Sequence, residues 1–221
     1  MILPPLTAIV DQDVSAAHGW SVPAAARAFL AGGARFIQVR GKSVPSRTLL
    51  DWCDEIVTAA AAVDGVVIVN DRPDVARMAG AAGVHVGQDD LRPPAVRAVV
   101  GPSAIVGLST HTREQILDAR AEPIAYAAVG PIFGSRTKDT GYDAVGLELV
   151  RVAAGAMGGH VAIVAIGGIT LDRAADVLAA GAASVAVIGD LFATRDPERR
   201  TRQYVDRLAE AVRGGHSGRA V

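Results

Sequence analysis

Eight short apolar segments recur along the chain, and a segment with the periodicity of an amphipathic helix follows each of them. The apolar segments are residues 6–10, 35–39, 66–69, 83–86, 104–108, 124–129, 161–166 and 184–188. They are too short for helices and rich in β-branched residues, which is typical of parallel strands buried on both faces. The eight units predict a closed (β/α)8 barrel, with an open doubly wound sheet as the less regular alternative.

Local signals indicate where several helices begin and end. Pro23 marks the start of the first helix. Thr170 is expected to cap the seventh helix, which would run to Gly181, and residues 196–198 (Asp-Pro-Glu) mark the start of the eighth. We therefore expect one barrel domain over residues 1–213 and a flexible tail over residues 214–221.

Composition and charge narrow the class of protein. Half of the residues are hydrophobic and 4% are aromatic, so the core is expected to consist of Ala, Val, Ile and Leu. The net charge is −1 without a long run of like charge, which argues against nucleic acid or an acidic membrane as the main partner. Cys53 is the single cysteine and is expected to be a buried thiol. Because we find no signal peptide or apolar segment of membrane length, we expect a cytoplasmic protein, and a homo-oligomer is left open.

The rare polar residue types lie where the predicted strands end. The chain has two lysines and one asparagine against twenty arginines, and Lys42, Asn70 and Lys138 all lie in polar clusters that follow apolar segments. Active sites of (β/α)8 barrels lie at the C-terminal ends of the strands. These clusters are therefore expected to surround one site.

Gln38, Arg40 and Lys42 lie at the end of the second strand at a spacing of two residues, so their side chains share one face and point to the barrel mouth. Two neighbouring cations are costly to desolvate unless an anion joins them, and a flexible lysine ammonium suits a phosphate. The spacing predicts a polyphosphate site, with a solvated strand end as the alternative.

Two carboxylates follow the next two strands. Asp71 and Asp90 each precede a helix that begins with proline, so Arg72 and Arg92 are expected at the cap positions and the carboxylates are left for another role. Adjacent strand ends bring the carboxylates together, and such a pair favours Mg²⁺, which binds one or two carboxylates together with phosphate oxygens. The five histidines lack the spacing of zinc ligands.

The fifth and sixth strand ends contribute a hydroxyl group and a long loop. Ser109 is expected to donate a hydrogen bond to a substrate, because neither an elbow motif nor a third partner supports nucleophilic catalysis with His111. Residues 130–143 form the longest loop, carry Lys138 and have the length of a lid, with a plain surface loop as the alternative.

Glycines follow the last two strands. Gly167-Gly168 and Gly189 would expose backbone N–H groups at helix N-termini, which predicts the phosphate cradle common in this fold. His85 lies within the fourth strand and is expected to be a hydrogen-bonded histidine of the core.

With these motifs the chain resembles the thiamine phosphate synthase family over nearly its whole length. The motifs are Gln38-Val39-Arg40-Gly41-Lys42, Asn70-Asp71-Arg72, residues 83–90 (GVHVGQDD), Ser135-Arg136-Thr137-Lys138 and residues 165–169 (AIGGI). The resemblance implies a barrel that joins 4-amino-2-methyl-5-hydroxymethylpyrimidine pyrophosphate to a thiazole phosphate and releases pyrophosphate. It also implies a dissociative mechanism, in which the thiazole nitrogen traps a pyrimidine carbocation.

The same resemblance implies roles for individual residues. The pyrophosphate would be held by Gln38, Arg40, Lys42, Asn70 and Lys138. Mg²⁺ would be held by Asp71 and Asp90, and the pyrimidine or its pyrophosphate would be contacted by Ser109 and Thr137. The thiazole phosphate would be cradled by Ser135, Gly168, Ile188 and Gly189. The main catalytic contributions are expected from Lys138, Arg40, Lys42 and Ser109.

Three positions depart from the pattern of the family, namely Gly41, Ser135 and Gly189. These departures bear on the affinity for the substrates and not on the reaction, because Ser135 keeps a hydroxyl group and a glycine keeps its backbone donor. The nearest alternative is the related thiazole tautomerase, for which His111 would be the acid/base but the two aspartates would be unexplained. A non-catalytic sensor of thiamine precursors is a further alternative, whereas a Schiff-base aldolase would need a lysine within a strand.

Overall fold

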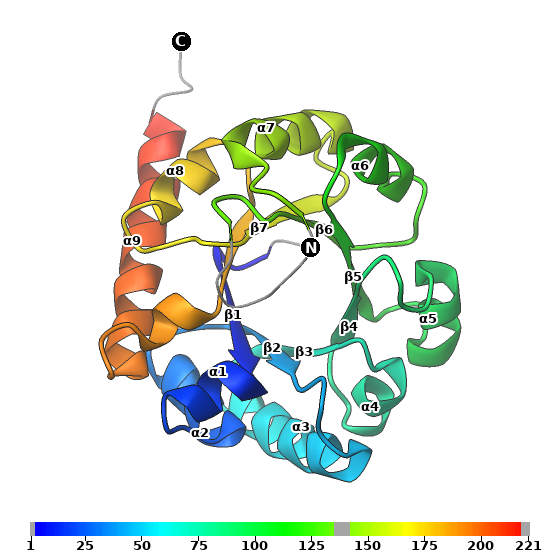
Figure 1. Cartoon of the computed structure of the whole chain (residues 1–221), viewed down its shortest axis with the longest axis vertical. Helices are drawn as coiled ribbons and strands as arrows, with labels where there is room; N and C mark the ends of the chain where they lie inside the picture. Colours follow the sequence, from blue (N-terminus) through cyan, green and yellow to red (C-terminus); the bar gives the residue numbers. More distant parts are fainter. Residues whose placement is uncertain (1–2, 135–141, 218–221) are drawn as a thin grey trace.

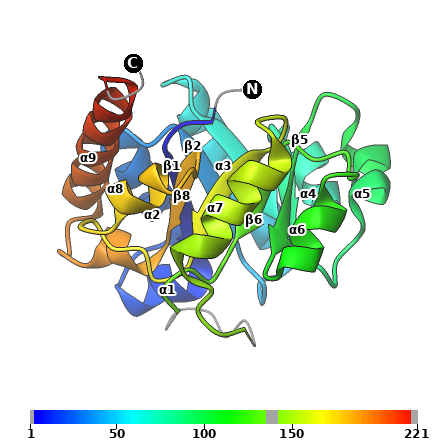
Figure 2. The ribbon, with the colours of Figure 1, turned by 90° about the horizontal axis from the view of Figure 1, so that it is seen from above.

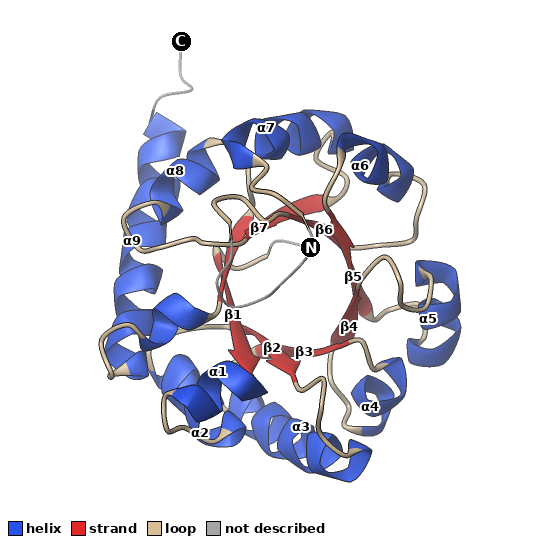
Figure 3. Cartoon of the chain, in the orientation of Figure 1, coloured by secondary structure: helices blue, strands red, loops and turns tan. Residues whose placement is uncertain are grey.

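The computed structural model describes residues 3–134 and 142–217, which form a closed barrel of eight parallel strands (Figure 1 and Figure 3). Each strand pairs with the next along the chain, and the last pairs with the first. The strands are β1 (Leu6–Asp11), β2 (Phe36–Arg40), β3 (Val66–Asn70), β4 (Gly83–Val86), β5 (Ile105–Thr110), β6 (Tyr126–Val129), β7 (Ala162–Ile166) and β8 (Ser184–Val187). The prediction of a (β/α)8 barrel is confirmed.

Helices lie outside the strands all around the barrel (Figure 1 and Figure 2). They are α1 (Gln12–Ala17), α2 (Val22–Ala31), α3 (Ser46–Ala61), α4 (Pro73–Met78), α5 (Pro93–Val100), α6 (Arg113–Ala119), α7 (Gly146–Met157), α8 (Ala174–Ala179), the 3-10 helix η1 (Gly189–Phe192) and α9 (Pro197–Ser217). Within the described ranges, none of these helices has the length and apolar character needed to cross a membrane.

The alternation of side chains along the strands separates two apolar clusters. Outward residues such as Val10, Val39 and Val69 pack against the helices in the large cluster. Inward residues fill the lower part of the barrel in a second cluster, which includes Ile9 and Ile68. Because this inner cluster forms a packed floor, the open space of the barrel is confined to its C-terminal end.

Most of the predicted helix boundaries agree with the structure. The helix expected at Pro23 is α2, whose N-cap Ser21 accepts a hydrogen bond from the Ala24 N–H at 3.3 Å. The start predicted at residues 196–198 is confirmed, because α9 begins at Pro197. This helix continues to Ser217, so its backbone extends into the segment that was expected to be a tail.

Two features near helix starts were not predicted correctly. The short helix α1 was missed, although Asp11 caps it by accepting hydrogen bonds from the Asp13 and Val14 N–H groups, both at 3.0 Å. Thr170 does not cap the seventh predicted helix, because α8 begins only at Ala174 and a turn precedes it. Both errors concern short elements whose capping residue alone gives too weak a signal.

Two glycines test the packing of the barrel. A Cβ atom on Gly83 would lie 1.9 Å from the Ile105 carbonyl oxygen on the paired strand, whereas one on Gly155, exposed on α7, would meet no atom within 4 Å. We expect Gly83→Ala to lower the free energy of unfolding by about 2–3 kcal/mol through overpacking. The matched variant Gly155→Ala is expected to raise it by about 0.5–1 kcal/mol through helix propensity. Urea denaturation of both variants measures the difference, and equal effects would contradict this account of Gly83.

Candidate active site

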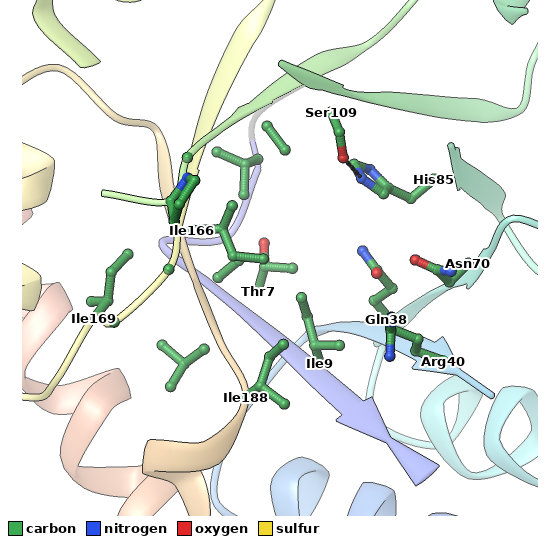
Figure 4. A pocket seen from close by; sticks show the side chains of 18 of the residues that line it. Thr7, Ile9, Gln38, Arg40, Asn70, His85, Ser109, Ile166, Ile169 and Ile188 are labelled. Atoms are coloured by element: carbon green, nitrogen blue, oxygen red, sulfur yellow. Dashed lines mark hydrogen bonds between the residues drawn. The ribbon is translucent and has the colours of Figure 1, made fainter. Parts of the chain in front are cut away.

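A cavity of about 690 Å³ lies at the C-terminal end of the barrel. Residues from all eight strands or from the loops that follow them line it. Figure 4 shows polar side chains, including Gln38, Arg40 and Asn70, on one side and the apolar Ile166 and Ile169 on the opposite side. The cavity therefore has one charged end at β2–β4 and one less polar end at β7–β8.

The three cavity-facing residues predicted on and after β2 all line this cavity. Arg40 forms an ion pair with Asp11, whose other carboxylate oxygen caps α1. The Lys42 Nζ atom lies 3.2 Å from the Asp71 Oδ2 atom. Each of these cations thus has a carboxylate partner, which offsets part of the cost of holding two positive charges side by side. Asp11 was not predicted, because no helix was expected directly after β1.

The structure brings Asp71 and Asp90 together, as their positions in the sequence predicted. Asp71 has a left-handed backbone with φ of 63°, and its N–H donates to the His85 carbonyl oxygen at 2.8 Å. The Asp90 Oδ2 atom accepts a hydrogen bond from the Gly87 N–H at 2.7 Å. The backbone around both residues therefore holds the carboxylates at adjacent strand ends.

The pKa of Asp90 is raised, first by burial and then by its hydrogen bond to Asp71 and the charge of that neighbour. The Gly87 N–H and the charge of Lys42 oppose this rise. Two carboxylates that repel one another are a suitable site for a small divalent cation. No group of three or more Asp, Glu, His or Cys that could hold a metal occurs among the described residues, so any cation here would also need oxygen ligands from a substrate or water.

Arg72 and Arg92 occupy the N-cap positions of α4 and α5, as predicted, and neither side chain forms a capping hydrogen bond. Asp71 and Asp90 are therefore not the caps of these helices. This removes the simplest structural explanation for the two carboxylates.

His85 is buried and hydrogen-bonded, as predicted, and it also lies on the cavity wall, which was not predicted. Its Nε2 atom lies 2.9 Å from the Ser109 Oγ atom, and its Nδ1 atom lies 2.9 Å from the Tyr126 hydroxyl oxygen. Figure 4 shows the contact between His85 and Ser109. Tyr126 was not predicted as a site residue. The alternation of β4 could have identified His85, because Val84 and Val86 face outward on either side of it.

His111, the residue expected to act in a tautomerase, also lines the cavity. Its Nδ1 atom lies 2.6 Å from the Gly130 carbonyl oxygen, and its ring stacks on Tyr142 with centroids 4.1 Å apart. Its backbone N–H donates a hydrogen bond to the Gln115 Oε1 atom at 2.7 Å. The imidazole is thus held against the start of the loop that follows β6.

The glycine-rich end of the cavity was predicted correctly in position but not in local structure. Gly167 and Gly168 have φ of 104° and 63°, and a Cβ atom on Gly168 would lie 2.2 Å from the Gly134 carbonyl oxygen. They form a turn before α8 rather than its N-terminus, whereas Gly189 is the first residue of η1. Ile188 lies beside Gly189 in the cavity wall. Only glycine allows the two loops to approach so closely.

One cation at this end was not predicted. Arg173 lines the cavity near the glycines, and its guanidinium carbon lies 4.8 Å from the centre of the Phe133 ring. Asp190, which also lines the cavity, pairs with Arg200 at 2.7 Å and accepts a hydrogen bond from the Tyr204 hydroxyl at 2.6 Å. The Asp190 charge is therefore compensated from behind the cavity wall.

Three of the predicted site residues, Ser135, Thr137 and Lys138, lie outside the residues that the structure describes. All the other predicted site residues line the cavity: Gln38, Arg40, Lys42, Asn70, Asp71, Asp90, Ser109, Gly168, Ile188 and Gly189.

The fold and the cavity define a (β/α)8-barrel enzyme with cations, paired carboxylates and a glycine cradle at the catalytic end of the barrel. A model of the family described as thiamine monophosphate synthase matches residues 6–191, so the chain belongs to this family.

Similar proteins agree with this assignment. The chain is 39% identical to a thiamine-phosphate synthase of Koribacter versatilis, over 93% of this chain and 96% of the relative. It is 42% identical to a thiamine-phosphate synthase of Anaeromyxobacter dehalogenans, over 89% of this chain and 85% of the relative. Among solved structures, a thiamine phosphate pyrophosphorylase from Pyrococcus furiosus matches with a TM-score of 0.83 and 28% identity, over 95% of this chain and 97% of the other.

The carboxylate pair predicts a pKa change that can be measured. Asp71→Asn removes the charged neighbour of Asp90, so the raised pKa of Asp90 should fall but stay above its ordinary value because burial persists. Because the pKa of Asp90 is raised in the folded state, its contribution to the free energy of unfolding is complete below about pH 4. That contribution is lost as the pH rises through the folded pKa. That loss should shrink in Asp71→Asn. Carboxyl carbon NMR titration measures the shift, with the exposed Asp89→Asn as control; an unchanged Asp90 pKa would contradict the coupling.

Proposed function

We propose that this chain condenses 4-amino-2-methyl-5-hydroxymethylpyrimidine pyrophosphate with a thiazole phosphate, giving thiamine phosphate and pyrophosphate. The observation that carries the proposal is the cavity at the barrel mouth, in which a cation-and-carboxylate end faces a glycine-and-arginine end. Two anionic groups of different size, a pyrophosphate and a monophosphate, suit these two ends. Membership of the thiamine monophosphate synthase family supports the same reaction.

The pyrophosphate belongs at the β2–β4 end. Arg40 and Lys42 supply positive charge there, and Asn70, which is largely buried, supplies an amide donor. Both cations already pair with carboxylates, so a bound pyrophosphate would share or replace these partners instead of meeting bare charges. The result is stabilisation of the negative charge that grows on the leaving group.

We also propose that Mg²⁺ binds between the pyrophosphate and the carboxylates of Asp71 and Asp90. The contact between the two carboxylates and the raised pKa of Asp90 fit such a site. A bound Mg²⁺ would supply further neutralisation of the leaving pyrophosphate. Lys42, at 3.2 Å from Asp71, would hold that carboxylate in place.

The cavity suits a dissociative reaction at the pyrimidine carbon. No strong general base is needed when the carbon–oxygen bond breaks first, and the main requirement is a stabilised leaving group in a space that excludes water. The apolar floor that includes Ile9 and the isoleucines at the β7–β8 end, Ile166 and Ile188, provide that space. The thiazole nitrogen then forms the new bond to the same carbon.

The thiazole phosphate belongs at the β7–β8 end. The positive φ values of Gly167 and Gly168 turn the backbone beneath the cavity wall, and Gly189 begins η1 beside them. Arg173 adds a positive charge at this end. In the family, position 189 often has a side chain with a hydroxyl group, which Gly189 lacks. Arg173 supplies a cation at the same end of the cavity.

The first experiment assays thiamine phosphate as fluorescent thiochrome after incubation with both precursors, with Mg²⁺ or with excess chelator. We expect product only with Mg²⁺, and we expect Asp71→Asn to lose most of the activity. Product formation without any divalent cation would refute the metal proposal alone. Absence of product with Mg²⁺ would refute the synthase, and His111→Asn would then test the tautomerase. Binding of both precursors without turnover would indicate a sensor.

A second experiment tests Lys138, whose role rests on the family resemblance. We expect Lys138→Ala to lower kcat by roughly 10²–10³-fold, the typical loss when one preorganised donor to a developing negative charge is removed. Arg151→Ala is the control, because Arg151 is an exposed cation that pairs with Glu148 outside the cavity. A loss of less than about threefold for Lys138→Ala would exclude the proposed role.

A cytoplasmic location, a homo-oligomer and the lack of a nucleic-acid partner stay predictions from the sequence.

The thiol of Cys53 is buried, which confirms the expected core position of this residue. Burial raises the pKa of the thiol to about 12.

A further inference from the structure

Two side chains of α9 support the cavity wall at its β7–β8 end from behind. Tyr204 is fully buried, and Arg200 lies beside it with its guanidinium carbon 5.6 Å from the centre of the Tyr204 ring. Both bind Asp190, the second residue of η1, and Asp190 lines the cavity whereas the two α9 residues do not. In Figure 1, α9 runs along the outside of the barrel next to α8. This end of the cavity therefore depends on a helix that does not reach the ligand.

The Tyr204 hydroxyl group connects the loops that follow β7 and β8. It donates to the Asp190 Oδ2 atom at 2.6 Å and lies 3.3 Å from the Ile169 carbonyl oxygen. Both partners can only accept, because one is a carbonyl oxygen and the other a carboxylate paired with Arg200. Burial, followed by the bond to Asp190, raises the pKa of Tyr204, so the phenol keeps the proton that it donates. Among the described residues, no backbone hydrogen bond joins residues 167–172 to residues 188–192, so this hydroxyl group supplies a connection that the backbone lacks.

The contacts of Arg200 fix both the side chain and the backbone of Asp190. The Arg200 Nη2 and Nε atoms donate to the Asp190 Oδ2 atom at 2.7 and 3.2 Å. The Nε atom also lies 3.2 Å from the Asp190 carbonyl oxygen. A carboxylate that was free to turn toward a bound phosphate would repel it, and the repulsion is strong in a cavity partly shielded from water. Arg200 and Tyr204 together hold the Oδ2 atom of this carboxylate and compensate its charge.

The two residues that Tyr204 contacts each follow a glycine of the cavity wall. Ile169 comes directly after Gly168, and Asp190 comes directly after Gly189. A backbone that contains glycine has more conformational freedom than any other, so it keeps one arrangement only when neighbouring residues hold it. A contact at Ile169 and another at Asp190 therefore restrict the backbone of both glycine loops at once.

We propose that Tyr204 and Arg200 are positioning residues for the phosphate group that binds at the β7–β8 end of the cavity. They hold the two glycine loops in one arrangement and keep the charge of Asp190 compensated and away from the ligand. The inference rests on the proposed function for the identity of that ligand. It extends the function to α9, a helix outside the barrel for which no role in the site was predicted.

The first test measures binding by calorimetry with one probe for each end of the cavity, neither of which needs turnover. The probes are 4-methyl-5-(2-phosphonooxyethyl)thiazole and inorganic pyrophosphate with Mg²⁺. Tyr204→Phe should raise the Kd of the thiazole phosphate by about tenfold and leave that of pyrophosphate within about twofold, because it removes a hydrogen bond at one end only. Thr201→Val is the matched control, since it removes another buried hydroxyl group of α9, which donates to the Pro197 carbonyl oxygen at 2.7 Å. It should change neither Kd by more than about twofold.

The second test isolates the charge of Asp190. Arg200→Gln leaves this carboxylate without its cation, so the Kd of the thiazole phosphate should rise by about tenfold, and by more at low ionic strength. Combining Arg200→Gln with Asp190→Asn removes the uncompensated charge and should bring the Kd back to within about threefold of the wild type. A double variant that binds as weakly as Arg200→Gln alone would overturn the role of charge compensation.

Two results of the first test would overturn the positioning role of Tyr204. One is an unchanged Kd of the thiazole phosphate in Tyr204→Phe, even where the wild type makes thiamine phosphate. The other is an equal rise of Kd for both probes, or an equal rise in Thr201→Val, since the effect would then be general loosening of the barrel.

The outcomes also separate this inference from the proposed function. A wild type that binds pyrophosphate but not the thiazole phosphate would refute the assignment of the β7–β8 end, and this inference with it. A wild type that binds both probes, shows the expected effect of Tyr204→Phe and makes no thiamine phosphate would refute the proposed reaction alone. That last result would still support the positioning role.

Discussion

The whole site depends on the alternation of side chains along eight short strands that close into a barrel. On β2, Ile37 and Val39 pack outward against the helices, so Gln38 must point into the barrel. On β4 the same constraint turns His85 inward between Val84 and Val86. A register shift by one residue would exchange the apolar and polar faces of a strand, so the hydrophobic outer layer and the site fix one another.

Charge compensation is the second constraint on the site, because cations and carboxylates lie close together at the barrel mouth. Arg40 pairs with Asp11 and Lys42 with Asp71, while burial and then the neighbouring Asp71 raise the pKa of Asp90. Ion pairs that are only partly buried can exchange partners at modest cost, unlike isolated buried charges. A polyanion with a divalent cation would complete this set, with the cations meeting the phosphates and the carboxylates meeting the metal.

The sequence predicted the barrel and most of the described site because both leave strong local patterns. The strands are continuous apolar segments, and Gln38, Arg40 and Lys42 lie at a spacing that only a strand gives to one face. Asp11, Tyr126 and Arg173 could not be predicted in this way. Their roles depend on which residues other strands and loops bring near them, such as Arg40 for Asp11 and Phe133 for Arg173.

Tyr126 lies between the floor and the cavity, and this position explains why its buried hydroxyl group is tolerated there. An apolar floor would pack as well without a phenol, and an unsatisfied hydroxyl in it would cost stability. The hydroxyl of Tyr126 instead lies 2.9 Å from His85 Nδ1, so it has a hydrogen-bond partner, and Gly107 leaves room for the ring because it has no side chain. Tyr126 thus packs in the floor of the barrel and, through its hydroxyl group, contacts His85, a side chain that lines the cavity.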